Sequence, residues 1–207
     1  MFITVEGQDG SGKSTQMQTI VSVLKSFSKE VVVTREVGGT PLAEELRKLL
    51  LHTHELSPRT EALIANAARC DHVEKVIQPA LDAGSWVVSD RYVHSTLAYQ
   101  CGGLGLYRSI AMDLHQIAAR GTLPDLTLLF DVDPEVGKSR MGDRVLDKFE
   151  EYKLDFVRRV RDAYLRLAAT NSRIIVIDAN QSLEQVTEAV RKVVTDFVTN
   201  ATRSHGV

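Results

Sequence analysis

The segment that decides the fold is Gly7-Gln8-Asp9-Gly10-Ser11-Gly12-Lys13-Ser14-Thr15, directly after Phe2-Ile3-Thr4-Val5-Glu6. It matches the phosphate-binding pattern G-x-x-x-x-G-K-[ST] at every defined position. The apolar run before it is rich in β-branched residues and predicts a buried strand. Four apolar residues after it recur at helical spacing: Met17, Ile20, Val21 and Leu24. Strand, loop and helix therefore occur in the order that the pattern requires.

This phosphate loop, Gly7–Thr15, predicts a site for the phosphates of a nucleotide. The first N–H groups of a helix have no partner within the helix, and the helix dipole adds partial positive charge at that end. Together they bind anions such as a triphosphate. We expect all nine loop residues to contact ATP, with Lys13 at the β- and γ-phosphates and the Ser14 hydroxyl on Mg²⁺. The alternative is a chance match in a glycine-rich turn.

The composition is that of an ordinary globular protein and predicts one domain over 1–207. With 25 basic and 27 acidic side chains, the net charge of −2 gives no overall field that favours nucleic acid or an anionic membrane. Cys70 and Cys101 are too few for a disulfide framework, which fits a reducing compartment. Without a charged leader or a long apolar run, we expect a cytoplasmic protein rather than a secreted or membrane one.

Five short apolar runs alternate with helical patterns along the chain. The expected strands are Phe2–Glu6, Val31–Glu36, Trp86–Asp90, Leu126–Val132 and Ile174–Asp178. Each is rich in Val, Ile or Leu without strict alternation, which is typical of parallel strands buried on both faces. The alternation predicts an α/β fold, a five-stranded parallel sheet with helices on both faces.

Helix start signals mark several of the connections. Proline follows a capping residue at Ser57-Pro58 and at Asp133-Pro134, and the first of these helices is expected to end near Leu81. An amphipathic helix is expected over Pro41–Leu51. Ser182 and Gln185 form a capping box that opens a last helix, and the tail from about Thr199 is expected to fray.

The strand ends carry the candidate chemistry, because ligands bind beyond the carboxyl ends of parallel strands. Arg35-Glu36 and Asp90-Arg91 each put an acid beside an arginine at such an end. A carboxylate can hold Mg²⁺ and a guanidinium can clamp a phosphate, so these arginines and Lys13 create room for a second phosphate group. Arg35 and Asp90 could instead form a structural salt bridge, and Asp131 is a second candidate acid for the loop.

Three motifs resemble those of the thymidylate kinase family, P-loop nucleoside monophosphate kinases that make dTDP from dTMP. They are Gly7–Thr15 with Asp9 inside it, Thr34-Arg35-Glu36-Val37-Gly38-Gly39-Thr40-Pro41, and Asp90-Arg91-Tyr92-Val93-His94-Ser95-Thr96-Leu97-Ala98-Tyr99-Gln100 followed by Gly102-Gly103. The segment from Ile177 to Ser182 is similar to the family's adenine-side loop. The resemblance spans essentially the whole chain and implies the three-layer fold of P-loop NTPases with a short lid.

For the phosphates, the resemblance implies that Arg35 and Arg91 hold the monophosphate of dTMP. Asp9 would accept a hydrogen bond from the 3′-hydroxyl of the deoxyribose. Asp90 would lie near Mg²⁺ and the transferring phosphoryl group, with Lys13 and Arg91 as catalytic cations.

For the base and sugar, the resemblance implies that Arg69 reads the thymine edge and that Thr96 and Gln100 face the base. Tyr99 would pack where a ribose 2′-hydroxyl would project, which favours deoxyribose. Ala65 stands where the family has a phenylalanine that stacks on the base, and Val37 stands where it has proline. A kinase for another deoxynucleoside monophosphate therefore remains an alternative.

The lid is expected at about 134–150, with Arg140 and Arg144 as its candidate catalytic arginines. The phosphate loop has no arginine, which is similar to the bacterial type of the family, where the lid supplies it. A solvated charged face is the alternative for these lid residues. The family also implies a homodimer. A nucleotide-dependent switch would use the same phosphate loop and is a second alternative. A nucleic-acid binder is a third, but the sequence has neither the excess of basic residues nor the aromatic platform that such proteins use.

Overall fold

The computed structural model describes residues 1–53, 55–142 and 153–204. Its five strands form one parallel sheet with the order β2-β3-β1-β4-β5. They are β1 (Phe2–Glu6), β2 (Val31–Arg35), β3 (Trp86–Asp90), β4 (Leu126–Asp131) and β5 (Ile174–Asp178). The predicted strands are confirmed to within one residue at each end.

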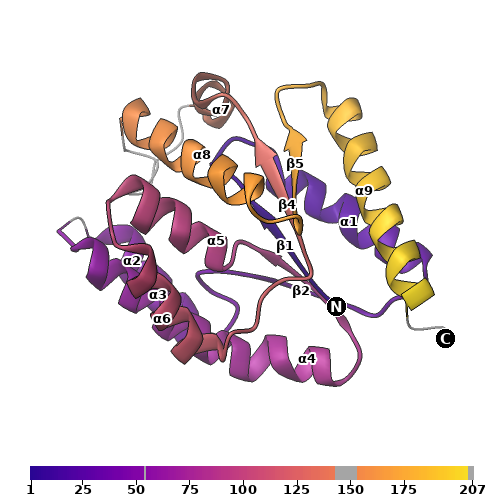
Figure 1. Ribbon diagram of the computed structural model, residues 1–207, viewed down its shortest axis with the longest axis horizontal. Coiled ribbons are helices and arrows are strands. Elements are labelled where there is room, and N and C mark those ends of the chain that lie inside the picture. The colour runs from indigo at the N-terminus through magenta and orange to yellow at the C-terminus, as the bar shows by residue number, and fades with distance from the viewer. Residues whose placement is uncertain (54, 143–152, 205–207) are drawn as a thin grey trace.

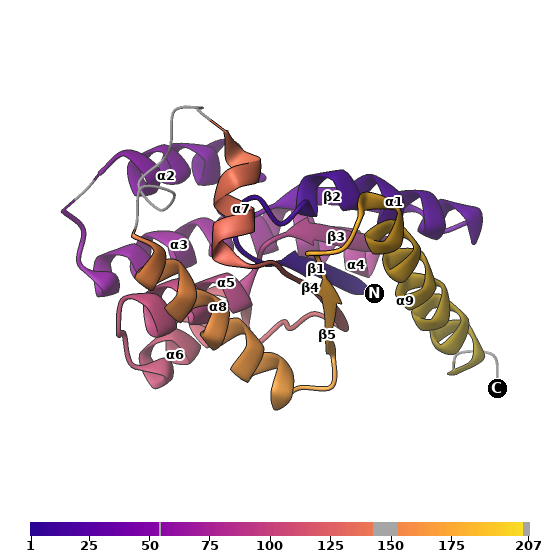
Figure 2. The ribbon, with the colours of Figure 1, turned by 90° about the horizontal axis from the view of Figure 1, so that it is seen from above.

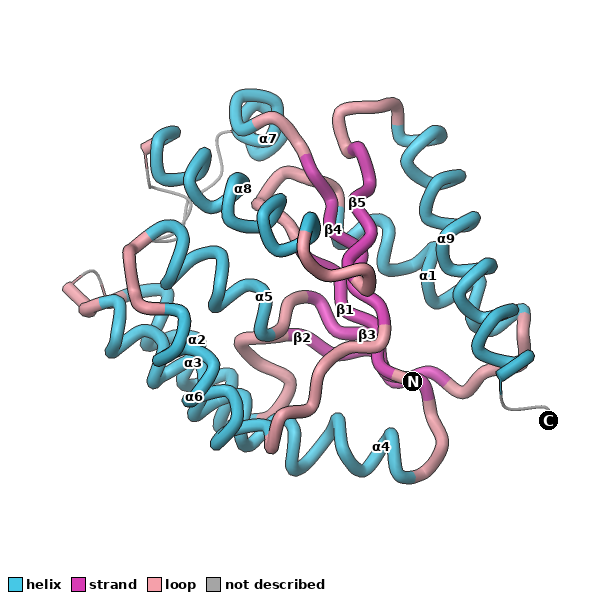
Figure 3. Tube along the Cα trace, viewed as in Figure 1, coloured by secondary structure: helices cyan, strands magenta, loops and turns pink. Residues whose placement is uncertain are grey.

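Helices cover both faces of the sheet (Figures 1 and 3). They are α1 (Lys13–Ser26), α2 (Pro41–His52), α3 (Pro58–His72), the π-helix η1 (Val73–Ile77), α4 (Gln78–Asp82), α5 (Val93–Thr96), the π-helix η2 (Leu97–Gly103), α6 (Arg108–Ala119), α7 (Pro134–Met141), α8 (Leu154–Ala169) and α9 (Leu183–Ser204). Seen from above, α1 and α9 lie on one side of the sheet and α3, α5, α6 and α8 on the other (Figure 2). This is the predicted three-layer arrangement of P-loop NTPases.

Alternation along the strands divides the core between the two faces. In β1, Ile3 and Val5 pack with the apolar stripes of α1 and α9, whereas Phe2 packs with Tyr92 and η1 on the opposite face. Leu129 in β4 likewise faces α8. Because successive side chains of a strand point to opposite faces, each central strand contributes to both cores.

Two sequence expectations were wrong in detail. The strands are not all buried on both faces, since the edge strands β2 and β5 expose part of their residues, such as Val33 and Val176. The chain does not fray from Thr199, because α9 continues to Ser204 and Val198 is fully buried against the core. The sequence alone did not show which strands take the edge positions.

Capping contacts confirm two of the predicted helix starts, whereas α7 begins at Pro134 as predicted but without a capping bond from the Asp133 side chain. Ser57 accepts a hydrogen bond from the Thr60 amide at 3.1 Å. Ser182 and Gln185 form a reciprocal capping box, with distances of 3.2 and 3.3 Å. Within the described residues, no helix is both long and apolar enough to span a bilayer.

Candidate active site

The phosphate loop runs from the end of β1 to the start of α1. Gly7 and Gly10 have positive φ values of 136° and 77°. A side chain at Gly7 would collide with the backbone oxygen of Phe130 in β4, and one at Gly10 with the backbone oxygen of Gly137 in α7. The loop therefore needs glycine there both for its turns and for its close approach to two neighbouring elements.

Lys13 is folded into this loop. Its ammonium donates to the carbonyl oxygens of Gly7 at 2.9 Å and Gln8 at 2.8 Å, and lies 3.7 Å from the Asp9 carboxylate. Burial, reinforced by the charge of Arg91, lowers the pKa of Lys13 from 10.5 to about 8. Both hydrogen bonds of this ammonium go to uncharged carbonyl oxygens, so a phosphate that reached it would add an anionic partner.

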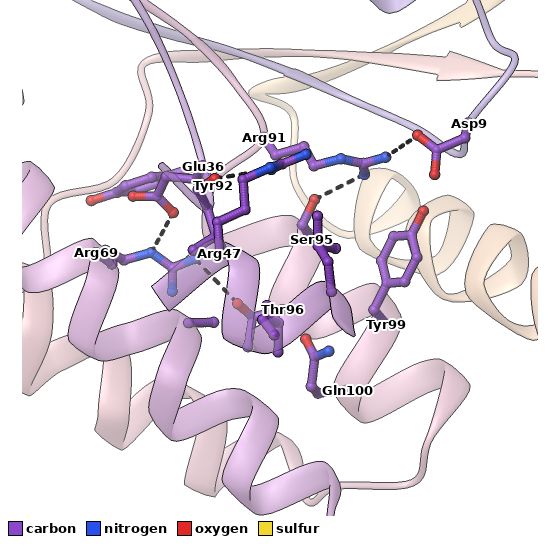
Figure 4. Close-up of a pocket in the computed structure, with 14 residues that line it drawn as sticks. Asp9, Glu36, Arg47, Arg69, Arg91, Tyr92, Ser95, Thr96, Tyr99 and Gln100 are labelled. Atoms are coloured by element: carbon purple, nitrogen blue, oxygen red, sulfur yellow. Dashed lines mark hydrogen bonds and ion pairs between the residues drawn. The ribbon is translucent and has the colours of Figure 1, made fainter. Parts of the chain in front are cut away.

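Arg91 joins the phosphate loop to a neighbouring cleft (Figure 4). Its guanidinium donates to the Asp9 carboxylate at 2.7 Å and to the Gly7 carbonyl at 3.0 Å. It also donates to the Ser95 hydroxyl at 3.2 Å and lies 5.2 Å from the centre of the Tyr99 ring. Asp9 and Arg91, which were predicted from two different motifs, therefore meet beside Tyr99.

The cleft beside Arg91 is open to solvent, and both apolar and polar side chains line it. Six predicted substrate residues line it: Asp9, Arg69, Arg91, Thr96, Tyr99 and Gln100. Its lining also includes Glu36, one of the two strand-end acids, and residues for which the sequence predicted no role at the site: Arg47, Leu50, Leu51, Tyr92 and Ser95. Most of the predicted acceptor site is thus one continuous surface.

Arg69 at the far end of the cleft is fixed by three hydrogen bonds. It donates to Glu36 at 2.8 Å, to Asn66 at 3.0 Å and to Thr96 at 3.1 Å, and its side chain is nearly completely buried. An arginine has five N–H donors and no acceptor, so two donors remain beyond these three bonds. A ligand at this end of the cleft meets a rigid hydrogen-bond donor.

Arg35 is the one predicted substrate residue outside the cleft lining. Its guanidinium forms a two-point ion pair with Glu44 of α2, with distances of 3.1 and 2.8 Å, and is 55% exposed. The pair holds the pKa of Glu44 below its usual value. The alternative of an Arg35–Asp90 salt bridge was wrong, because the Arg35 guanidinium binds Glu44 instead.

Asp90 and Ser14 were the predicted ligands of Mg²⁺. Within the part of the chain that the structure describes, Asp90 Oδ1 is buried without a hydrogen-bond partner, and no cluster of three metal-binding side chains occurs. Ser14 is exposed in the first turn of α1. An unpartnered carboxylate oxygen and a hydroxyl fit Mg²⁺, which in nucleotide sites takes few protein ligands and several phosphate oxygens and waters.

The predicted lid is only partly described. Arg140 in α7 donates to the carbonyl oxygen of Ala179 at 2.8 Å, in the predicted adenine-side loop. Arg144 lies outside the described residues. Asp131, the second candidate acid, is instead paired with Arg161 of α8 at 2.7 and 2.9 Å. The Asp131 carboxylate is therefore already bound by a cation of the protein.

Glu6 at the end of β1 holds several residues around the cleft in place through hydrogen bonds, a role that was not predicted. Its carboxylate accepts hydrogen bonds from the Tyr92 amide at 2.8 Å, the Ser95 hydroxyl at 2.6 Å and the Tyr164 hydroxyl at 2.8 Å. Burial raises the pKa of Glu6. The sequence feature that could have indicated this role is an acid at the end of a buried strand.

His94 is also buried, and burial lowers its pKa to about 4, so it is a neutral packing residue.

Comparison with known proteins gives one family. The family model described as "Thymidylate kinase" matches residues 5–190. A thymidylate kinase of Nitrosomonas europaea is 49% identical over 199 residues, covering 95% of this chain and 93% of the relative. One of Hahella chejuensis is 46% identical over 194 residues, covering 92% and 93%, and one of Haemophilus ducreyi is 44% identical over 204 residues, covering 97% and 95%. The chain belongs to the thymidylate kinase family, whose members are phosphotransferases.

Proposed function

We propose that this protein transfers the γ-phosphoryl group of ATP to dTMP and so makes dTDP for dTTP synthesis. One observation carries the proposal. Arg91 reaches the phosphate loop through Gly7 and Asp9 and lines the cleft beside Tyr99. One cation therefore lies between the predicted triphosphate site and the cleft, where two phosphorylated molecules can meet.

Phosphoryl transfer needs positioning and charge stabilisation rather than a covalent group of the protein. Different residues of the site serve the two nucleotides. The phosphate loop holds ATP through its main-chain N–H groups, and Lys13 neutralises the β- and γ-phosphates. Arg91 holds the dTMP phosphate in line with the γ-phosphorus. Arg35 lies at the neighbouring strand end and reaches that phosphate when its bond to Glu44 is exchanged for one to the substrate.

At the other end of the cleft, Arg69, Thr96 and Gln100 contact the base. Asp9 accepts a hydrogen bond from the 3′-hydroxyl, and Tyr99 fills the space of a 2′-hydroxyl. Burial raises the pKa of Tyr99, so its hydroxyl stays protonated and uncharged beside the sugar. The site thereby favours deoxyribose by shape rather than by charge.

Mg²⁺ is proposed as the cofactor, held by Ser14 and Asp90 together with the phosphate oxygens of ATP. When bound, it neutralises charge on the transferring phosphoryl group. The carboxylate of Asp90 is kept in reach of the loop by the register of β3, where Asp90 pairs with Val5 of β1.

A lid at about 134–150 is proposed to close over the phosphates as part of a single domain of 207 residues, with Arg140 or Arg144 supplying positive charge. Closure excludes water, which would otherwise accept the phosphoryl group. The described part of this segment supports it: α7 packs directly on the phosphate loop, with Gly137 against Gly10.

A homodimer is proposed as the assembly. Helices α3 and α6 pack on one another, and each exposes a large apolar side chain, Leu63 and Ile117. The basis of the proposal is the family to which the chain belongs, because single exposed apolar residues also occur on monomers.

An ADP-release assay with ATP and Mg²⁺ across dTMP, dUMP, dCMP and dGMP tests the acceptor. We expect the highest kcat/KM with dTMP. Ala65, the small residue in the cleft, is the observation that favours a different acceptor, and a preference for dCMP or dGMP would establish that alternative. Slow hydrolysis of ATP that is independent of every acceptor would instead indicate a nucleotide switch.

A further inference from the structure

Glu61 is a buried acid next to the proposed base end of the cleft, and the proposed reaction gives it no role. Glu61 lies in the first turn of α3 and is 1% exposed. It shares one face of that helix with Ala65 and Arg69, which follow at intervals of four residues and both line the cleft. A carboxylate is costly to bury, so its hydrogen-bond partners matter.

Gln100 of η2 is a partner of this acid. Its amide nitrogen donates to the Glu61 carboxylate at 3.0 Å, and both side chains are buried. Gln100 also lines the cleft, and Figure 4 shows its amide oxygen on the side toward Thr96. A carboxylate accepts hydrogen bonds and donates none, so the NH₂ group of Gln100 must turn toward Glu61. The amide oxygen is thereby left to the cleft.

This orientation gives the cleft a defined hydrogen-bond pattern. Arg69 presents donors only, and Gln100 presents an acceptor. Thymine and uracil offer the complement, an oxygen on C4 and a hydrogen on N3. Cytosine offers the reverse, an amino group on C4 and a bare N3, and would leave buried polar groups unpaired.

We propose that Glu61 is a positioning residue for base selection: it fixes the Gln100 amide so that its oxygen faces the base and selects pyrimidines with a hydrogen on N3. The inference rests on the proposed function, because it takes this end of the cleft as the base site. Glu61 acts through Gln100 and does not contact the substrate.

The test compares acceptors that differ at one position. dUMP and dCMP differ only at C4 and N3, whereas dTMP and dUMP differ only by the methyl group. In Glu61→Gln the new amide can donate or accept, so Gln100 can turn either way. We expect the kcat/KM ratio of dUMP to dCMP to fall about tenfold, mainly through KM, the change that loss of one hydrogen bond produces. The ratio of dTMP to dUMP and the KM of ATP should stay within about twofold.

Exchanging the pair supplies a second variant that does not depend on Glu61→Gln alone. In Glu61→Gln/Gln100→Glu, the amide at position 61 donates to the carboxylate at position 100, which again presents only acceptors to the base. We expect this double variant to recover most of the preference for dUMP over dCMP. Glu74→Gln, an exposed change in η1, is the matched control and should alter neither ratio.

The outcomes separate this inference from the proposed function. If the unchanged protein phosphorylates dTMP but folded Glu61→Gln keeps its dUMP-to-dCMP ratio, the positioning role is wrong and the kinase remains. Equal losses in both acceptor ratios would indicate a purely structural role and also overturn it. If the unchanged protein phosphorylates no pyrimidine nucleotide, the proposed function itself fails.

Discussion

At the scale of single residues, Arg91 is the cation on which the proposed reaction depends. Arg91→Ala removes the group that touches both the phosphate loop and the cleft. We expect kcat/KM for dTMP to fall at least about 100-fold, as for the loss of other groups that stabilise transition-state charge. Far-UV circular dichroism should show the fold intact.

Arg120→Ala is the matched control, because Arg120 is 86% exposed and remote from the cleft lining. Its rates should equal those of the unchanged protein. A near-normal rate in Arg91→Ala would remove this arginine from the site.

Lys13 predicts a pH dependence of stability in the nucleotide-free protein. Burial lowers its folded-state pKa to about 8, against 10.5 in the unfolded chain. Between these values the unfolded state binds more protons, so the free energy of unfolding contributed by Lys13 rises with pH. Relative to Lys13→Met, the unchanged protein should gain about 2 kcal/mol between pH 7 and pH 10. Urea unfolding of both proteins at several pH values measures this, and a constant difference would contradict the buried ammonium.

Local motifs predicted which residues would gather at the site but not how they would be held. Asp9, Arg91 and Tyr99 came from two motifs, and the structure brings them together. The bonds of Glu6 to Tyr164 and of Glu61 to Gln100 join residues 158 and 39 positions apart. No local pattern encodes such pairs, because they depend on how distant elements pack.

At the scale of elements, α8 is tied to the end of β4 by one ion pair. Arg161 binds both oxygens of Asp131, and both side chains are largely buried. Arg161→Met should lower the free energy of unfolding by about 1–2 kcal/mol, because it leaves a partly buried carboxylate unpaired. Arg158→Met on the same helix removes an exposed pair and should cost less than about 0.5 kcal/mol. If denaturant titrations gave equal losses of unfolding free energy for the two variants, the larger contribution of the Arg161–Asp131 pair would be contradicted.

The elements themselves were predictable because their signals are local. Strand composition marked all five strands, and capping residues marked helix starts such as those at Ser57 and Ser182, but no signal was identified for α5, α6 or α8. The exposure of β2 and β5 was not predictable, because it follows from their edge positions in the sheet. The π-helices η1 and η2 also carried no signal, since a wider turn barely changes the apolar spacing.

At the scale of the whole molecule, the proposed assembly is a homodimer. Light scattering behind size exclusion should give twice the 22.9 kDa of one chain at micromolar concentration. The expectation follows from the resemblance to the thymidylate kinase family, to which the chain belongs. A mass of one chain across the whole concentration range would contradict it.

The central claim is that the phosphate loop and the cleft hold two nucleotides whose phosphates meet beside Arg91. Phosphorus NMR of the protein with ATP, Mg²⁺ and dTMP follows the transfer directly. We expect dTDP and ADP in equal amounts, with inorganic phosphate only a minor product. Inorganic phosphate and ADP without dTDP would contradict it.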